Sequence, residues 1–200
     1  MIQRTLILIK PDAMERGVVG EIISRFERVG LRILEGKMVT VTEDLATEHY
    51  PVTDEWLNKV GNNTISDCEK YGLDVKVTMG TDDPIEIGRL VHSWNKDWLM
   101  SMPILALVLQ GIHAVEVVRK LCGPTLPLLA PPGTIRGDFS SASAISENIN
   151  KKPIRNLVHA SGTVEEADRE INLWFPELKN KTTHKKSAVV MDDSLLKANQ

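Results

Sequence analysis

Cysteine is scarce in this sequence, and neither of the two cysteines belongs to a recognisable motif. The 200 residues contain only Cys68 and Cys122. They form no C-x-x-C pair and have no metal-type spacing to a histidine, so no metal or redox motif is predicted. Both thiols are expected to be small buried residues, which suits a reducing compartment.

A large excess of charge of either sign is also missing. Charged residues make up 26% of the chain, and the formal net charge is -3. A nucleic-acid-binding regulator would normally be strongly basic or carry a stripe of aromatic and basic residues. No nucleic-acid partner is therefore expected. If the ligand is anionic, a local cluster of cations must bind it.

Long apolar runs and the common nucleotide-binding motifs are absent as well. The first apolar run ends at Lys10 and does not resemble a signal peptide. No run reaches the ~20 residues that a membrane span needs, so we expect a cytoplasmic protein without a membrane partner. The chain has no Walker A motif, no G-x-G-x-x-G and no H-E-x-x-H, which leaves P-loop and Rossmann folds unsupported.

Strands and helices do alternate along the chain, and 42% of the residues are hydrophobic. The apolar spacing predicts strands at 5–9, 31–41, 104–109 and 156–158, and helices at 18–29, 45–50, 113–121 and 164–175. Residues 51–102 are less regular, although Asp83-Pro84-Ile85-Glu86 is a strong helix start. This order predicts an α+β sandwich in which helices pack on one sheet.

Polar side chains gather at the ends of these elements. They are Lys10, Arg119, Thr125, Arg136, Asn156 and His159, with Arg136 closing a Pro/Gly-rich loop at 123–137. Each alone has an ordinary explanation, since a helix-end arginine complements the helix dipole and a lone histidine is more often structural. Together they suit a site that holds a polyphosphate without a P-loop.

Three local strings are more specific. They are Lys10-Pro11-Asp12-Ala13 with Glu15-Arg16-Gly17, the string PGTIRGDF at 132–139, and the string RNLVHAS at 155–161. In this order and setting they resemble the nucleoside diphosphate kinase family. The resemblance covers about residues 4–50, 104–139 and 155–176.

The resemblance also implies how the chain is organised. It indicates an α+β fold, a ferredoxin-like βαββαβ sandwich with a helical insertion after the second strand and a C-terminal extension. We expect one domain over residues 1–176, with the insertion at about 51–102 and a loop extension at about 140–152. Residues 177–200 would form a C-terminal arm.

The implied chemistry is centred on His159. This residue resembles the family's nucleophile, which reacts through Nδ1. Glu170 is similar to the carboxylate that orients the imidazole, and Ser161 to the hydroxyl that supports that pair. An imidazole with a pKa near ~6.5 is largely neutral at pH 7, and a carboxylate on its second nitrogen fixes the tautomer.

The other matched residues look like a nucleotide site. Those resembling the family's phosphate clamp are Lys10, Arg119, Thr125 and Arg136. Lys10 and Asn156 would also reach the sugar 3′ hydroxyl, and Tyr50 would lie near the transferred phosphate. The implied cofactor is Mg²⁺, held mainly by the nucleotide's own phosphates and by water.

The implied activity is transfer of a γ-phosphate between nucleoside triphosphates and diphosphates, such as ATP/ADP and GTP/GDP. It would follow a ping-pong mechanism through a phosphohistidine. Family members assemble as hexamers or tetramers, so a homo-oligomer is expected, and deletion of residues 178–200 is predicted to weaken it. The alternative is an inactive nucleotide-binding scaffold.

The chain departs from the family pattern in two places. Ala160-Ser161-Gly162 stands where the family has Gly-Ser-Asp, so the acid near the metal is missing and Asp12 or Asp138 would have to compensate. The family's Phe-Phe pair is also missing after Tyr50. Side chains considered for the base slot and the insertion core are Trp56, Val60 and Pro153 for the slot, and Trp94 and Trp98 for the core.

Overall fold

A four-stranded antiparallel sheet forms the centre of the fold in the computed structural model, which describes residues 1–178. The strands are β1 (Ile2–Ile9), β2 (Arg32–Val39), β3 (Ile104–Ile112) and β4 (Val158–Ala160), in the order β2-β3-β1-β4. Every neighbouring pair is antiparallel. Helices α2 (Val19–Arg28) and α7 (Ala114–Cys122) connect the strands of each half, which confirms the predicted ferredoxin-like sandwich.

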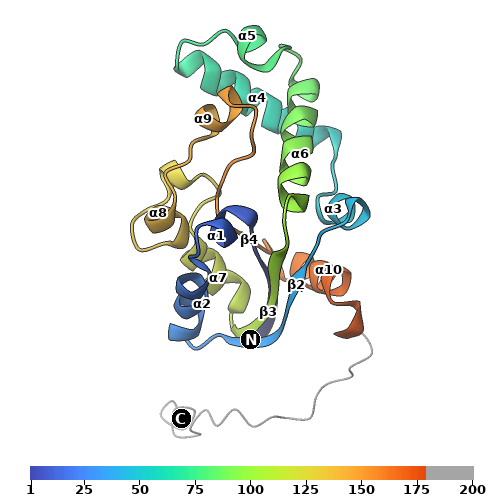
Figure 1. Ribbon diagram of the computed structural model, residues 1–200, viewed down its shortest axis with the longest axis vertical. Helices are drawn as coiled ribbons and strands as arrows, with labels where there is room; N and C mark the ends of the chain where they lie inside the picture. Colours follow the sequence, from blue (N-terminus) through green and yellow to red (C-terminus); the bar gives the residue numbers. More distant parts are fainter. Residues whose placement is uncertain (179–200) are drawn as a thin grey trace, which may run out of the picture.

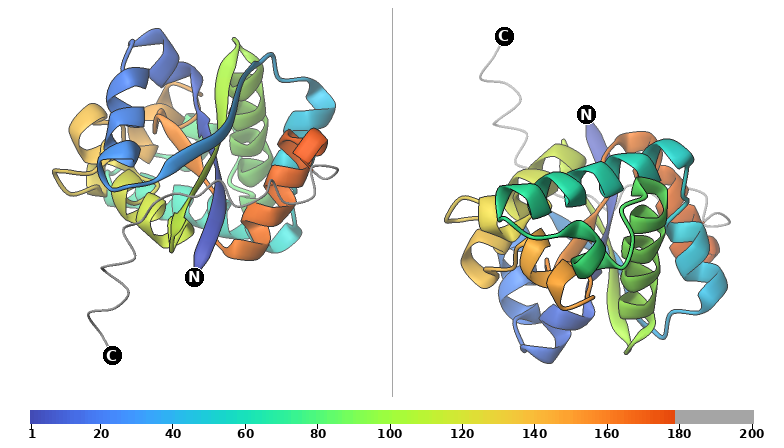
Figure 2. Two further views of the ribbon diagram at one scale, coloured as in Figure 1. Left: turned by 90° about the horizontal axis from the view of Figure 1, so that it is seen from below. Right: turned by 90° about the horizontal axis from the view of Figure 1, so that it is seen from above.

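Helices cover both faces of the sheet (Figures 1 and 2). Because side chains alternate along a strand, Ile7 and Ile9 of β1 face α2 and α7, where Phe26 and Val118 complete one core. Leu6 and Leu8 point the other way. There they pack in a second core with residues of α3 (Glu43–His49) and α10 (Val164–Trp174). The central strand is therefore buried on both sides.

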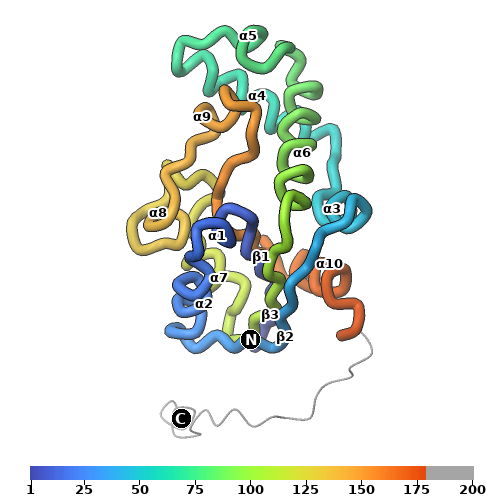
Figure 3. Tube along the Cα trace, viewed as in Figure 1, coloured from blue at the N-terminus to red at the C-terminus, as the bar shows by residue number. Residues whose placement is uncertain are grey.

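The segment 51–102 is more regular than its sequence indicated. It contains α4 (Asp54–Lys70), the short α5 (Val75–Met79) and α6 (Pro84–Met100), which stand above the sheet as a helical hairpin (Figure 3). The helix start predicted at Asp83 is confirmed, since its carboxylate accepts hydrogen bonds from the backbone N–H groups of Ile85 and Glu86. Helix α4 was missed because its sequence is largely polar and lacks a clear apolar stripe.

Two glycines allow α4 and α6 to pack closely. A Cβ atom at Gly61 would lie 1.9 Å from the backbone oxygen of Pro84. One at Gly88 would lie 2.4 Å from the backbone oxygen of Leu57. Any side chain at either position would push the helices apart. The spacing of the two helices is thus set by backbone contact.

Three short elements differ from the prediction. Helix α1 (Pro11–Glu15) follows β1 directly and was not predicted. Arg136 lies in helix α8 (Ile135–Phe139), whose N-cap Thr134 accepts a hydrogen bond from the Gly137 N–H, and so it does not close a loop. His159 lies within β4 and does not follow it.

The remaining elements are short. They are η1 (Pro127–Leu129), α9 (Ala144–Ile149) and η2 (Pro176–Leu178). No helix among residues 1–178 combines the length and the apolar character needed to cross a membrane. Residues 179–200, most of the predicted arm, lie outside the described part of the chain.

Candidate active site

A cavity of about 490 Å³ opens where the end of β4 meets helices α3, α6, α7 and α10. Every predicted site residue except Ser161 lines it: Lys10, Tyr50, Trp56, Arg119, Thr125, Arg136, Asn156, His159 and Glu170. Ser161 is fully buried behind it. Residues that are far apart in the sequence, from Lys10 to Glu170, therefore meet in one cavity. The spacing of the motifs alone does not reveal this proximity.

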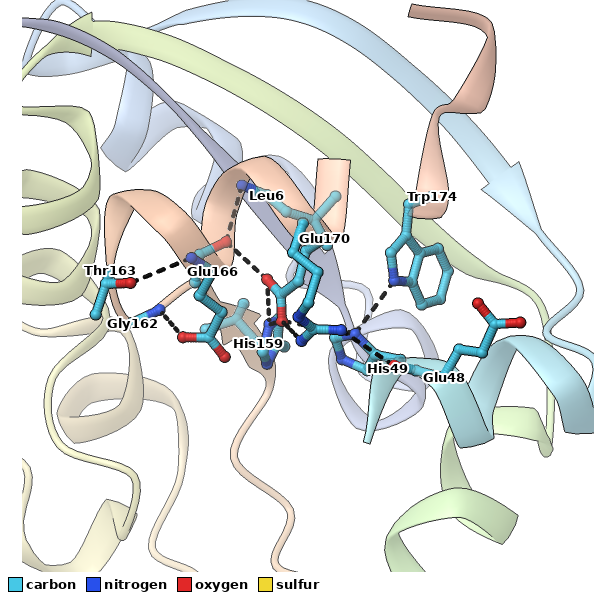
Figure 4. A network of polar contacts seen from close by, with 12 residues as sticks. Leu6, Glu48, His49, His159, Gly162, Thr163, Glu166, Glu170 and Trp174 are labelled. Carbon is cyan, nitrogen blue, oxygen red and sulfur yellow. Dashed lines mark hydrogen bonds and ion pairs between the residues drawn. The ribbon is translucent and has the colours of Figure 1, made fainter. Parts of the chain in front are cut away.

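His159 is held from behind by Glu170. The Nε2 atom of His159 lies 2.9 Å and 3.0 Å from the two carboxylate oxygens of Glu170 (Figure 4). Ser161 donates its hydroxyl to Oε2 of Glu170 at 2.7 Å and accepts the backbone N–H of Leu6 at 3.2 Å. An ionised carboxylate accepts hydrogen bonds only, so the proton is on Nε2 and Nδ1 keeps its lone pair.

A second histidine, His49, packs edge-on against His159, with ring centroids 4.4 Å apart. Its Nδ1 accepts the indole N–H of Trp174 at 3.2 Å. Burial, and then the nearby His159, lower the pKa of His49 well below its ordinary range, so the ring is neutral. In the sequence, only its position next to Tyr50 distinguishes this histidine.

His49, His159 and Glu170 also bring possible metal-ligand atoms within 4.8 Å of one another. Nδ1 of His49 is already bonded to Trp174, and Nε2 of His159 is already bonded to Glu170. These bonds account for Nδ1 of His49 and for the His159–Glu170 pair, whereas Nε2 of His49 is buried with no hydrogen-bond partner among the described residues. Tyr50 beside it remains a neutral phenol, because burial raises its pKa above the ordinary value.

Lys10 connects the end of β1 to the segment that leads into β4. Only 5% of Lys10 is exposed, and its Nζ donates to Oδ1 of Asn156 at 3.0 Å. Burial lowers the pKa of Lys10 to about 8, although the nearby Asp12 carboxylate acts in the opposite direction. The amide of Asn156 in turn donates to the backbone oxygen of Thr125 at 3.0 Å.

The two arginines predicted for the phosphate clamp have different surroundings. Arg136 is buried and donates to the backbone oxygens of Asn156, Gly123 and Val158 at 3.1, 2.7 and 2.7 Å. Arg119 is exposed in the last turn of α7. Arg136 therefore ties the loop ends together as well as supplying charge, whereas Arg119 offers a free guanidinium.

The two acids suggested as replacements at the metal site face elsewhere. Oδ2 of Asp12 accepts the backbone N–H of Leu157 at 2.8 Å. This contact fixes Leu157 at φ 70, a conformation that leucine rarely adopts, between Asn156 and Val158. Asp138 is paired with Arg25 at 2.6 Å. Neither carboxylate lines the cavity.

The hairpin supplies the outer wall of the cavity. Trp56 is 37% exposed, and its ring lies 5.9 Å from that of His92. Nε2 of His92 donates to the backbone carbonyl oxygen of Tyr50 at 3.0 Å, because a carbonyl can only accept, so Nε2 carries the ring proton. Asn95 of α6 lines the same wall.

The other side chains considered for this region lie away from the cavity. Val60 and Pro153 do not line it, and Pro153 is buried. Trp94 and Trp98 are half-buried on α6 and do not line it either. The guanidinium of Arg155 lies over the Trp98 ring at 5.1 Å.

Helix α10 adds two charged side chains that the motif comparison did not single out, Glu166 and Arg169. Glu166 lies four residues before Glu170, so both carboxylates project from one face of α10. This spacing of four residues is the one sequence feature that could have identified Glu166 as a neighbour of the site. Oε2 of Glu166 accepts the backbone N–H of Gly162 at 2.6 Å.

Comparisons with known proteins agree with this geometry. A family profile described as nucleoside diphosphate kinase matches residues 3–58 and 88–179. The nucleoside diphosphate kinase of Pyrobaculum aerophilum is 46% identical over 176 residues, 88% of this chain and 96% of that protein. That of Borreliella burgdorferi is 37% identical over 179 residues, 88% of this chain and 89% of that protein.

Two solved structures are similar to the whole fold. A crystal structure of the Pyrobaculum aerophilum NDP kinase has a TM-score of 0.83 at 44% identity and covers 88% of this chain and 96% of its own. A transition-state mimic of the Borrelia burgdorferi enzyme, with bound vanadate and ADP, has a TM-score of 0.70 at 34% identity and covers 98% and 96%. By profile, sequence and structure alike, the chain belongs to the nucleoside diphosphate kinase family.

Proposed function

We propose that this protein is an active nucleoside diphosphate kinase that transfers a γ-phosphate between nucleotides through phosphorylated His159. One observation carries the proposal. Glu170 is hydrogen-bonded to Nε2 of His159, which leaves Nδ1 available, and His159 lines the same cavity as the cations Lys10, Arg119 and Arg136. An inactive scaffold would have no need of a tautomer fixed by a buried carboxylate.

The transfer takes place in two half-reactions that share one cavity. In the first, the Nδ1 lone pair of His159 forms a bond to the γ-phosphorus, and the bond to the bridging oxygen breaks. The nucleoside diphosphate leaves with that electron pair. In the second, a terminal phosphate oxygen of another nucleoside diphosphate forms a bond to the phosphorus of the phosphohistidine, and the bond from phosphorus to Nδ1 breaks, with its electron pair returning to Nδ1. Glu170 stabilises the positive imidazole during both steps.

The other predicted residues position the nucleotide. Lys10, Arg119, Thr125 and Arg136 would hold the phosphates, with Lys10 and Asn156 near the sugar and Trp56 stacked on the base. The neutral phenol of Tyr50 is a hydrogen-bond donor for the transferred phosphate. Most of the catalytic gain would come from fixed positive charge and orientation, as phosphoryl transfer requires.

A magnesium ion fits this cavity. Hard oxygen donors suit Mg²⁺, and two carboxylates, those of Glu166 and Glu170, are found in the described lining. Glu170 is committed to His159. The ion would be held mainly by the nucleotide's phosphates and water, and when bound it would neutralise charge on the phosphate oxygens.

We extend the proposal to the protein's setting. It acts on ATP/ADP, GTP/GDP and other nucleotides in the cytoplasm, as a homo-oligomer of four or six chains. Residues 1–176 form one domain that carries the insertion and the loop extension. These statements rest on family membership.

Replacement of His159 by alanine tests the mechanism. The variant should form no phosphoenzyme with ATP and should lose transfer activity, because the other two histidines of the described lining are bonded elsewhere, His49 through Nδ1 to Trp174 and His92 through Nε2 to the Tyr50 carbonyl. Wild-type protein should carry a phosphate that is labile in acid and stable in alkali. Substantial activity in the purified variant would refute the assignment, and a wild type that binds ADP without forming phosphoenzyme would indicate the inactive scaffold.

A further inference from the structure

Glu166 is an acid in a cavity whose other free charges are positive. No ion pair joins it to Lys10, Arg119 or Arg136 within residues 1–178. Among the described residues, its carboxylate accepts a hydrogen bond from the backbone N–H of Gly162, through Oε2 (Figure 4). A carboxylate and a phosphate repel each other, so Glu166 alone would oppose polyphosphate binding unless a cation lay between the carboxylate and the phosphates.

Gly162 leaves room for this carboxylate. A Cβ atom at position 162 would lie 2.5 Å from Oε2 of Glu166 and 3.5 Å from Nη1 of Arg119. The Glu166 carboxylate therefore occupies the space that a side chain at 162 would fill, next to a predicted phosphate-binding arginine. An acid from the next helical turn stands where the family pattern has aspartate at 162.

The start of α10 holds Glu166 in this position. Thr163 is the N-cap, and its hydroxyl accepts the backbone N–H of Glu166 at 3.1 Å. Glu166 is thus at the third helical position, from which a side chain reaches back over the helix start. The carboxylate is half-buried and is fixed by the backbone, as a positioning residue must be.

We infer that Glu166 positions the hydrated Mg²⁺ of the bound nucleotide, in place of the aspartate missing at Gly162. The inference rests on the proposed function. Mg²⁺ keeps several of its waters and is usually bound by phosphates and one or two carboxylates. A carboxylate that accepts hydrogen bonds from those waters turns the repulsion into an attraction that exists only when the metal is present.

The test measures ADP affinity by calorimetry, with Mg²⁺ and with EDTA, for wild type and for Glu166→Gln. Glutamine can still accept the Gly162 N–H and cap the helix, so the fold is kept. We expect the variant to lose roughly 10-fold of the affinity gained from Mg²⁺, the lower end of what loss of an outer-shell partner costs. Its metal-free affinity should be equal or higher. Glu165→Gln, an exposed neighbour on the same turn, should retain the full gain.

A rescue variant separates this role from helix capping. Glu166→Ser combined with Gly162→Asp returns an acid to the same space from position 162, and should restore the gain that Glu166→Ser alone loses. An unchanged Mg²⁺ gain in Glu166→Gln, or an equal loss with and without metal, would overturn the inference. Because phosphoenzyme formation by wild type is assayed separately, failure of the proposed function would be recognised as such.

Discussion

Arg119 and Arg136 show how two residues with the same charge can differ in structural role. Substitution of either by alanine should lower kcat/KM by roughly 10²–10³, the effect of losing one charge-stabilising donor worth ~2.7–4 kcal/mol. Arg136 also bonds to three backbone oxygens, so Arg136→Ala should in addition lower the melting temperature. Arg119→Ala should leave it unchanged, because Arg119 is exposed.

Steady-state kinetics and thermal denaturation of both variants test this difference. If either substitution changes KM alone, that residue only binds substrate and does not favour the transition state. If Arg136→Ala melts like wild type, its three backbone contacts contribute little to stability.

Lys10 predicts an alkaline limit to the reaction. Burial lowers its pKa from 10.5 to about 8, so the clamp loses this charge as the pH rises through that value. The rate of phosphoenzyme formation at low ATP should therefore fall above about pH 8. Lys10→Arg, which stays charged, should form the phosphoenzyme more slowly but should not show this fall in rate at alkaline pH.

The same shift has the opposite effect on stability. Between about 8 and 10.5 the unfolded chain binds a proton at Lys10 that the folded chain has lost, so this group adds stability as pH rises. Denaturant titrations across that window, compared with Lys10→Met, would measure it. A contribution that falls with pH would contradict the assigned shift.

At this scale the sequence predicted residues that belong to contiguous motifs. Lys10, Arg136, Asn156 and His159 were found because their neighbours in sequence are specific. His49 was missed because its role depends on Trp174, which is distant in sequence and meets it only in the fold. Glu166 was overlooked for a different reason, since its meaning depends on the space left by Gly162.

Among the elements, buried strands were the easiest to predict. β1 and β3 are nearly continuous apolar runs, whereas α4 is polar along much of its length and is held by the close contact of Gly61 with Pro84. The local sequence of α4 does not show which helix packs against it, so the hairpin could not be predicted. The short α1 and α8 were lost for a related reason, because one helical turn has too few residues to show a period.

Helix α6 and the start of α4 bear on nucleotide choice. Trp56 offers a ring on which any base can stack, and stacking is worth about 1–3 kcal/mol per base. We therefore predict that kcat/KM for ATP, GTP, CTP and UTP will fall within about 100-fold, well below the 10⁴–10⁵ of hydrogen-bond readout. Trp56→Ala should lower all four values by similar factors.

Asn95 provides the internal control for this prediction. It lines the cavity from α6 and can donate and accept hydrogen bonds. Asn95→Leu should leave the order of the four donors unchanged if the base is bound by stacking. A wider spread in wild type that collapses in Asn95→Leu would show that α6 reads the base edge.

For the whole molecule, the outer edge of the sheet is the feature that matters. β2 is an edge strand, paired only with β3 in the described chain. It carries exposed apolar side chains, with Ile33 40%, Leu34 44% and Met38 55% exposed. An edge strand with exposed apolar side chains is a ready template for pairing with another chain, and soluble proteins normally cover or charge it. This surface supports the proposed homo-oligomer independently of family membership.

We predict that full-length protein is a tetramer or hexamer. Leu34→Lys should lower the mass of the assembly measured by light scattering, because a charge on the β2 edge opposes pairing.

The C-terminal arm is predicted to strengthen the same assembly through Val189, Val190, Leu195 and Leu196, which lie outside the described residues. Truncation after Leu178 tests the arm while keeping that side chain, which packs against the second core. Multi-angle light scattering should show weaker assembly with phosphohistidine formation intact. A monomeric wild type would refute the oligomer, and an unchanged mass after truncation would refute the role of the arm alone.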